Sequence, residues 1–469
     1  MSGTFMDISV PPSLIAFAVD VLKVQDAVSP EFKRVGSKIY IVPAVRDAYD
    51  LPDFAVLKHN FACICALSKK GRVLAAHSVR NGGIAAAISK MTLGNRIGFE
   101  FTPKVTNDML FACDYGTVIL ELALDANPEK SLEGTGYYEL GTTIELPNII
   151  CGESIISITK VEKAFTGTLE KIFPTKTKEN ANAKRIKSVF YKVGNKVSRQ
   201  DSYAKPRIFI PVFPGTNCEY DTAKAFEKAG GQAETLVIRN LTATAVEESV
   251  EAIVKGIKQS QIIMLPGGFS GGDEPDGSGK FIAAMFRNPR ITEAVMNLLK
   301  RRDGLMLGIC NGFQALIKLG LVPYGEITDL TIDTPTLTHN QIGRHISCMV
   351  NTKVVSNLSP WFNNVQVEDV HTIAVSHGEG RFVASPDIVA KLRANGQIAT
   401  QYVDFAGNPA LTIPFNPNGS TEAIEGITSP DGRILGKMGH SERIGNGVCV
   451  NIPGQKDQKL FEAGVKYYK

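Results

Sequence analysis

The chain has 469 residues, of which 43% are hydrophobic and 21% are charged, and this balance is typical of packed globular proteins and excludes wholesale disorder. A net charge of +4 over this length gives no basic field that would indicate a nucleic-acid partner. No apolar stretch approaches the ~20 residues that span a bilayer, so no membrane association is expected. Eight scattered cysteines without a Cys-x-x-Cys pair, and a start without the pattern of a secretory signal, predict a reduced, cytoplasmic compartment.

Residues 1–165 are expected to form an α+β domain. In chain order, the patterns predict a short buried helix after two prolines, two strands, an alanine-rich helix and a further strand, at 14–22, 37–42, 61–67, 84–91 and 116–124. Strands and helices alternate unevenly here, which favours an α+β arrangement over a doubly wound sheet.

Residues 166–205 differ from the segments on either side. Lysine and arginine outnumber the acidic residues, and the apolar periodicity fades. The segment is interpreted as a basic connector, partly helical and laid over the surface. Its charge indicates a solvated face, with phosphate binding as the alternative.

From residue 206 to residue 469 the pattern becomes regular. Short apolar strands are predicted at 208–212, 233–238, 262–265 and 305–309. Helices are predicted up to about residue 229 and at 245–257, 281–286, 291–299 and 313–319. This alternation predicts a doubly wound parallel sheet, in which the chemistry gathers at the carboxyl ends of the strands.

The strongest local motif is Gly308-Ile309-Cys310-Asn311-Gly312. It has the G-x-nucleophile-x-G form of a nucleophile elbow, with an apolar strand before it and a helix after it. At the N-terminus of that helix, the dipole and the free N–H groups stabilise a thiolate. The motif therefore indicates a cysteine nucleophile at Cys310; the alternative is a small buried cysteine in the core of a sheet.

A thiolate that attacks a carbonyl also needs donors for the oxyanion. The N–H of Asn311 is one candidate. The glycine-rich loop after the preceding strand should lie beside the elbow, and there Gly268 or Phe269 could supply the second donor. A flexible surface turn is the alternative interpretation of that loop.

A cysteine hydrolase also needs a histidine and an acid that orients it. Two of the seven histidines have a glutamate two positions later, His377 with Glu379 and His440 with Glu442, and the spacing does not choose between them. The other five are expected to be structural or at the surface. No set of residues has the spacing of a metal site, so no metal is expected, and the sequence around Cys63 and Cys65 predicts a strand.

Taken together, four motifs in order resemble the class I (triad) glutamine amidotransferases, and among them the phosphoribosylformylglycinamidine synthase family of purine biosynthesis. The motifs are Pro266-Gly267-Gly268-Phe269-Ser270, Gly308-Ile309-Cys310-Asn311-Gly312-Phe313-Gln314, Val375-Ser376-His377-Gly378-Glu379-Gly380-Arg381 and Gly439-His440-Ser441-Glu442-Arg443. The resemblance implies a flavodoxin-like class I glutaminase fold. It also implies that Cys310 forms a glutamyl thioester, with His440 as the base and Glu442 as its orienting partner.

Further roles are implied by the same resemblance. Gln314 would help to bind glutamine, and His377 and Glu379 would support the site. The glutaminase step itself would need no cofactor. Ammonia would pass to a synthase region, where ATP, with Mg²⁺, activates formylglycinamide ribonucleotide for conversion to the amidine.

The N-terminal portion resembles the last domain of that synthase region, which is related to the C-terminal domain of aminoimidazole ribonucleotide synthetase. The resemblance lies in residues 10–17 and 76–83, although the family has aspartates where this chain has Ser78 and Asn81. Because only a trailing part of the synthase matches, the chain is expected to be a C-terminal segment of the whole enzyme. The preceding synthase domains would then be supplied in cis or as a separate chain.

Two other functions remain open at this point. The chain could be a different cysteine hydrolase on the same sheet, of the peptidase or deglycase type. Those enzymes commonly have a histidine directly after the nucleophile, where this chain has Asn311. It could also be a binding module that keeps the elbow only as a scaffold.

Overall fold

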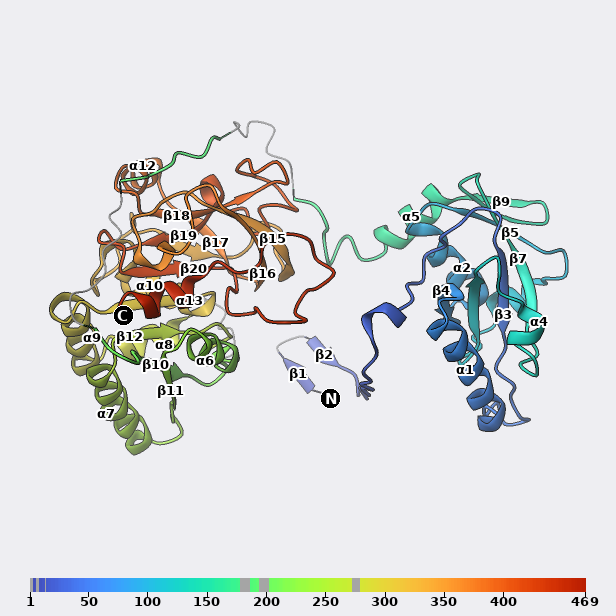
Figure 1. The fold of residues 1–469 in the computed structure, drawn as a ribbon, viewed down its shortest axis with the longest axis horizontal. Helices are drawn as coiled ribbons and strands as arrows, with labels where there is room; N and C mark the ends of the chain where they lie inside the picture. Colours follow the sequence, from blue (N-terminus) through green and yellow to red (C-terminus); the bar gives the residue numbers. More distant parts are fainter. Residues whose placement is uncertain (1–2, 6–7, 13, 178–185, 194–201, 272–278) are drawn as a thin grey trace. The chain divides into compact units, whose positions relative to one another are not determined.

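The computed structural model describes residues 3–5, 8–12, 14–177, 186–193, 202–271 and 279–469 (Figure 1). The chain divides into two compact units, Met1–Ile172 and Phe173–Lys469. Each unit has its own sheet and its own hydrophobic core. None of the helices in the described ranges is long and apolar enough to cross a membrane.

The first unit is built on a seven-stranded sheet with the order β4-β6-β3-β7-β5-β8-β9. Neighbouring strands run antiparallel except β5 and β8, which are parallel. The strands are β3 (Lys38–Val42), β4 (Val73–Ser78), β5 (Gly98–Phe101), β6 (Val118–Leu122), β7 (Tyr138–Ile144), β8 (Asn148–Cys151) and β9 (Ser154–Ser157), and a separate hairpin pairs β1 (Gly3–Phe5) with β2 (Ile8–Val10). A mostly antiparallel sheet with helices confirms the α+β class expected here.

Helices cover this sheet. They are η1 (Val24–Asp26), α1 (Phe54–Lys69), α2 (Gly83–Leu93), α3 (Asn107–Phe111), α4 (Pro128–Ser131) and α5 (Ile158–Gly167). Helix α2 packs against α3, α5, β4 and β5, and its Ile88 and Met91 are fully buried in the larger core of the unit. The expected helix at 84–91 and the expected strands at 37–42 and 116–124 are therefore confirmed.

Two expectations for this unit are wrong. Residues 61–67 lie inside helix α1, whose first turn is capped because the Asp53 side chain accepts hydrogen bonds from the N–H groups of Ala55 and Val56. Cys63 and Cys65 are thus helical. Residues 14–22 form no helix, and Leu14 and Phe17 are 98% and 88% exposed. An apolar run becomes a buried helix only where another element covers it, and no described element covers this one.

Residues 186–193 of the connector lie within the second unit. The N–H of Tyr191 donates to the carbonyl of Val355 at 2.9 Å, and the N–H of Asn357 donates to the carbonyl of Tyr191 at 3.1 Å. Lys192 forms an ion pair with Glu368 at 2.7 Å. Many of the connector's basic residues fall in 178–185 and 194–201, which lie outside the described residues.

The second unit contains a nine-stranded sheet with the order β11-β10-β12-β13-β20-β19-β18-β15-β16. The strands are β10 (Arg207–Val212), β11 (Gln232–Val237), β12 (Ile262–Leu265), β13 (Leu305–Ile309), β15 (Ile346–Val354), β16 (Val370–His377), β18 (Ile398–Val403), β19 (Ile424–Thr428) and β20 (Ile434–Lys437). The first five strands in this order are parallel and have the 2-1-3-4-5 connectivity of flavodoxin-like sheets. All four residues of β12 are buried, as expected for a parallel strand that is covered on both faces.

Two groups of helices pack on the parallel strands. The first group consists of α6 (Glu219–Lys228) and α13 (Leu460–Lys466), which contact each other (Figure 1). The second group consists of α7 (Ala243–Gln259), α8 (Lys280–Phe286), α9 (Pro289–Arg301) and α10 (Asn311–Leu319). In this group α9 contacts both α7 and α8, and α8 also contacts α10. Helix α7 illustrates the origin of this packing, because Val250, Ile253 and Ile257 recur at helical spacing and are all buried. These elements confirm the predicted doubly wound sheet.

The structure extends that sheet in a way that the sequence patterns did not predict. Beyond β20, the strands β19, β18, β15 and β16 pair antiparallel. The remaining elements are α11 (Leu321–Tyr324), α12 (Pro386–Ala394), the short helices η2 (Pro360–Phe362) and η3 (Thr421–Ala423), and a two-stranded sheet of β14 (Thr336–Thr338) and β17 (Arg381–Val383). As a result, residues after β16 can reach the edge where the parallel strands end.

Candidate active site

Cys310 lies in a sharp turn between strand β13 and helix α10. Its φ of 51° and ψ of −104° are uncommon for a residue with a side chain, as in a nucleophile elbow. The following Gly312 allows the helix to approach the sheet, since a Cβ at that position would lie 2.0 Å from the Leu265 carbonyl oxygen. The N–H of Cys310 donates to the Lys437 carbonyl at 2.8 Å, which fixes the turn against β20.

The Cys310 thiol is enclosed by polar groups of two other segments. Its Sγ donates to the carbonyl oxygen of Ser376 at 3.7 Å, and the thiol lies close enough to the His440 imidazole to raise the pKa of that ring. The residue is 4% exposed, so the surrounding loops cover the thiol in this structure. The sulfur has an imidazole within reach, which is the arrangement that a cysteine nucleophile requires.

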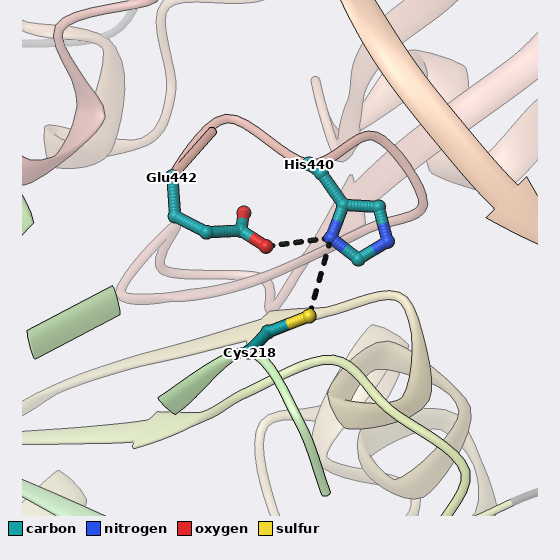
Figure 2. Close-up of side chains that lie close together, drawn as sticks. All are labelled: Cys218, His440 and Glu442. Atoms are coloured by element: carbon teal, nitrogen blue, oxygen red, sulfur yellow. Dashed lines mark hydrogen bonds and ion pairs between the residues drawn. The ribbon is translucent and has the colours of Figure 1, made fainter. Parts of the chain in front are cut away.

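His440 and Glu442 follow strand β20 and form a buried pair (Figure 2). The His440 Nδ1 and the Glu442 Oε1 are 2.5 Å apart, and the two residues are each 3% exposed. The N–H of His440 donates to the carbonyl of Ala374 at 2.8 Å, which ties this loop to β16. Of the two histidine–glutamate pairs, this is the one that contacts Cys310.

Electrostatics in this pair favour the charged forms. Burial acts to lower the pKa of His440, whereas the Glu442 carboxylate raises it. Hydrogen bonds with the thiols of Cys218 and Cys310 act in the same direction as the carboxylate, and the pKa of His440 lies well above the usual value for histidine. Burial acts to raise the pKa of Glu442, but its interaction with His440 outweighs burial and lowers that pKa. The site therefore stabilises an imidazolium–carboxylate pair.

The predicted oxyanion loop lies beside the elbow. Gly268 has a φ of 143°, a conformation that favours glycine, and the N–H of Phe269 donates to the Gly215 carbonyl at 2.8 Å. Since that bond occupies the N–H of Phe269, Gly268 is the better candidate of the two. The Asn311 N–H belongs to the first turn of α10, where backbone donors have no partner within the helix. Residues 272–278 of this loop lie outside the described residues.

Gln314 is engaged in a buried network. Its Oε1 accepts from Asn311 Nδ2 at 2.9 Å, and its Nε2 donates to the Glu379 carbonyl at 2.5 Å. Asn311 Oδ1 accepts in turn from the N–H of Ser270 at 3.2 Å. The network joins the oxyanion loop, the first turn of α10 and the segment after β16. The Glu379 Oε1 lies 3.6 Å from the His339 Nδ1.

His377 lies at the end of β16 and is 1% exposed. Its Nδ1 is 3.2 Å from the Asn340 Oδ1, and its Nε2 has no hydrogen-bond partner among the described residues. Burial, together with the charges of His440 and His345, lowers the pKa of His377 to about 3. A buried, neutral histidine that contacts an asparagine has the surroundings of a structural residue, whereas His440 is paired with a carboxylate.

Three further side chains at this site were missed by sequence reasoning. The Cys218 Sγ is 3.8 Å from the His440 Nδ1 (Figure 2), and Cys218 is 3% exposed. Lys437 and Glu425 form a fully buried ion pair at 3.2 Å, from which Lys437 Nζ also donates to the Gly439 carbonyl and the Glu425 Oε1 accepts from the Gly439 N–H. In the sequence, only the position of Cys218 after the first parallel strand could have indicated that it lies at the site. The pairing of Lys437 with Glu425 corresponds to no sequence motif.

A family model matches residues 205–468, and it describes a CobB/CobQ-like glutamine amidotransferase domain. This match covers more than half of the chain and the whole site described above. The chain therefore belongs to the CobB/CobQ-like glutamine amidotransferase family, which confirms the class expected from its motifs.

Curated relatives within this class point to a particular enzyme. Over 239 residues the chain is 35% identical to "Phosphoribosylformylglycinamidine synthase subunit PurQ" of Methanococcus maripaludis, an alignment that covers 51% of this chain and 82% of the relative. The subunit of the same name from Dehalococcoides mccartyi is 34% identical over 244 residues, which cover 52% of this chain and 88% of the relative. A solved structure, "Structure of PurLQS from Thermotoga maritima", has 28% identity and a TM-score of 0.40, and covers 56% of this chain and 100% of that chain.

Proposed function

We propose that residues 205–468 hydrolyse the side-chain amide of glutamine with Cys310 as the nucleophile. The observation that carries the proposal is the contact of the elbow cysteine with His440, whose Nδ1 is held by Glu442 at 2.5 Å. The Cys310 thiolate forms a bond to the amide carbon, and the carbonyl electrons move to the oxygen. When they return, the C–N bond breaks and a glutamyl thioester remains.

His440 moves the protons in both halves of this reaction. As an imidazolium it gives its proton to the departing nitrogen, which leaves as ammonia. As a neutral base it then takes a proton from the water that attacks the thioester, and glutamate and the thiolate are released. Glu442 holds the ring orientation and stabilises the imidazolium in each half.

The N–H groups of Asn311 and Gly268 are proposed to stabilise the oxyanion in both tetrahedral intermediates. Gln314 is proposed to support the glutamine site by holding the Glu379 backbone, because its own amide is already hydrogen-bonded. His377 and Glu379 are proposed to support the same wall of the site.

The named relatives support a place for this glutaminase in phosphoribosylformylglycinamidine synthase. We propose that the ammonia serves a synthase partner, in cis or as a separate chain, that uses ATP and Mg²⁺ to form an amidine from a formyl amide. The glutaminase step needs no cofactor in this scheme. The first unit is proposed to be a trailing part of such a synthase, and the site of action to be the cytoplasm.

Ammonia release from glutamine by the full chain tests the proposal. Cys310→Ala is expected to lose the activity by about a thousandfold or more, whereas the matched variant Cys348→Ala retains it. A glutamine-like electrophile should label Cys310 in preference to the other seven cysteines. Hydrolysis of peptides but not of glutamine would instead support a cysteine peptidase, and labelling mainly at another cysteine would contradict the assignment.

A further inference from the structure

Three metal-ligating side chains of different chemistry converge beside the catalytic thiol without a role for all of them in glutamine hydrolysis. They are Cys218, His440 and Glu442, all buried, and their ligand atoms lie within 4.8 Å of one another (Figure 2). We propose that this cluster binds a soft divalent cation such as Zn²⁺ and that the bound metal reversibly blocks the glutaminase. The binding stands by itself, whereas the inhibition rests on the proposed function.

The donor atoms match the preferences of zinc. Zn²⁺ is commonly bound by a thiolate, an imidazole nitrogen and a carboxylate oxygen in tetrahedral geometry. With metal–ligand lengths of about 2.3 Å for sulfur and 2.0–2.1 Å for nitrogen, the two donors in such a site lie about 3.6 Å apart. The Cys218 Sγ and the His440 Nδ1 are 3.8 Å apart, so these two ligands need almost no movement.

Glu442 supplies the third ligand. Its Oε1 binds the His440 Nδ1 at 2.5 Å, but its Oε2 is buried and has no hydrogen-bond partner among the residues that the structure describes. An unpaired buried carboxylate oxygen costs free energy, which a cation would relieve. A metal between ring and carboxylate replaces the shared proton and requires the two groups to separate by about 1 Å, given ordinary zinc–ligand lengths.

Charge is balanced when the metal binds. The Cys218 thiol and the His440 Nδ1 each lose a proton to solvent, and the resulting thiolate and the Glu442 carboxylate together neutralise the two charges of Zn²⁺. Arg443 opposes a cation here, because its Nη2 donates to the Cys218 Sγ at 3.5 Å. Arg443 also lines an adjoining cavity.

This cavity borders the proposed site at Glu442. It has a volume of about 570 Å³, and its charged lining is mixed: Glu442 and three further acidic side chains (Asp221, Asp457 and Glu462) face it together with the basic side chains of Lys224, Lys228, Arg443 and Lys459. The fourth metal position would be filled by water or by the Asn217 Oδ1, which is 3.2 Å from the Cys218 Sγ. A ligand set, an adjoining cavity and a fourth coordination position are thus present together.

Metal binding would remove the catalytic base. An imidazole that ligates a metal through Nδ1 carries its remaining proton on Nε2, so it cannot accept the proton of the attacking thiol or water. The Glu442 carboxylate is taken up by the metal at the same time. The same three side chains would therefore hold either a working base or a metal ion.

Co²⁺ is the probe for binding, because a bound thiolate gives it an intense near-ultraviolet absorption that does not depend on enzyme activity. The metal-free full chain should bind one Co²⁺ with this absorption, and Zn²⁺ should displace it. Cys310→Ala and the matched variant Cys348→Ser should behave like the parent chain. Cys218→Ser and His440→Ala should both lack the absorption. The two variants remove different ligands, so one of them still tests the site if the other folds poorly. Persistence of the absorption in Cys218→Ser, or its absence in the parent chain, would overturn the proposal.

Inhibition is measured on the same proteins. Zn²⁺ should suppress ammonia release by the parent chain, a chelator should restore it, and Cys218→Ser should need at least about tenfold more Zn²⁺ for the same suppression of its own metal-free rate. A parent chain that binds Co²⁺ but never releases ammonia would contradict the proposed function alone. A chain that releases ammonia but shows no thiolate absorption would contradict the metal site alone.

Discussion

At the scale of single residues, the site depends on a cysteine in an unfavourable backbone conformation. With a φ of 51° and a ψ of −104°, Cys310 occupies a region that costs on the order of 1–3 kcal/mol. The conformation brings the sulfur to the Ser376 carbonyl at the end of β16, while the next N–H group starts helix α10. The proposed nucleophile and the proposed oxyanion donor are therefore presented side by side by two consecutive residues.

The two histidines near this cysteine are expected to differ in their effect on activity. His440→Ala removes the group that is paired with Glu442 at 2.5 Å and should abolish measurable turnover of the thioester. His377→Ala removes a neutral buried ring and should leave a measurable rate. Steady-state ammonia release is measured for both variants. A measurable rate in His440→Ala and none in His377→Ala would instead assign the catalytic base to His377.

His377 should also make stability depend on pH. Its pKa is about 3 in the folded chain, against 6.5 for an ordinary histidine, so the unfolded state binds the extra proton between these values. Stability is then lost as the pH falls below 6.5. From pH 7 to pH 5 the parent chain should lose about 2 kcal/mol more unfolding free energy than His377→Asn.

Trp361 makes this measurement specific to the second unit, because it is the one tryptophan of the sequence and is fully buried there. Denaturant unfolding would be followed by its fluorescence at the two pH values. Equal losses in the parent chain and in His377→Asn would show that His377 does not titrate in this way.

The elbow and the two histidine–glutamate pairs could be predicted from the motifs themselves. The choice of His440 over His377 came only from the resemblance, because the two pairs had the same spacing. The structure separates them through backbone pairing, since His440 lies opposite Ala374 on β16. Cys218 could not be predicted as a neighbour of His440. The two residues are joined by the fold alone, and a lone cysteine at the start of a helix has no distinctive pattern.

At the scale of elements, the loop after β20 is fixed by a buried ion pair on the neighbouring strands. Lys437 ends β20 and Glu425 lies on β19, and both side chains are fully buried. The lysine also donates to the Ser441 Oγ at 2.9 Å, next to His440. The pair therefore holds both ends of the segment that carries the proposed base.

Lys437→Met should destabilise the second unit by about 3–5 kcal/mol, because it leaves the Glu425 carboxylate buried and uncompensated. Glutaminase activity should fall as the loop shifts. The double variant Lys437→Met with Glu425→Gln removes both charges and should recover part of the stability, as measured by Trp361 fluorescence. A single variant as stable as the parent chain would contradict this role of the ion pair.

Predictions of elements succeeded where local pattern and environment agree. The strands at 262–265 and 305–309 were predicted with the bounds that β12 and β13 have, because strands buried on both faces are continuously apolar. The same rule failed at 61–67, where a continuous apolar run belongs to a long helix. The antiparallel strands β15, β16, β18 and β19 were not predicted, since their pairing is set by distant partners.

At the scale of the whole molecule, the two units have separate cores. The larger core of the first unit is formed between residues 32 and 149, and that of the second begins at Ile208. No buried residue of one core belongs to the other among the described residues. Each unit therefore has the packing that permits it to unfold by itself.

Unfolding of the chain should accordingly proceed in two transitions. Trp361 fluorescence reports the second unit, whereas far-ultraviolet circular dichroism reports the helices of both. The two signals should not coincide along a denaturant series. Superimposable curves would show instead that the units unfold as one cooperative structure.

The bond between the Cys310 N–H and the Lys437 carbonyl has a consequence for biosynthesis. The ribosome makes β13 long before β20, so the turn lacks its partner strand for much of translation. Until β20 docks, nothing on that side opposes relaxation of the turn. A nascent chain would thus complete this turn only after β20 has been made.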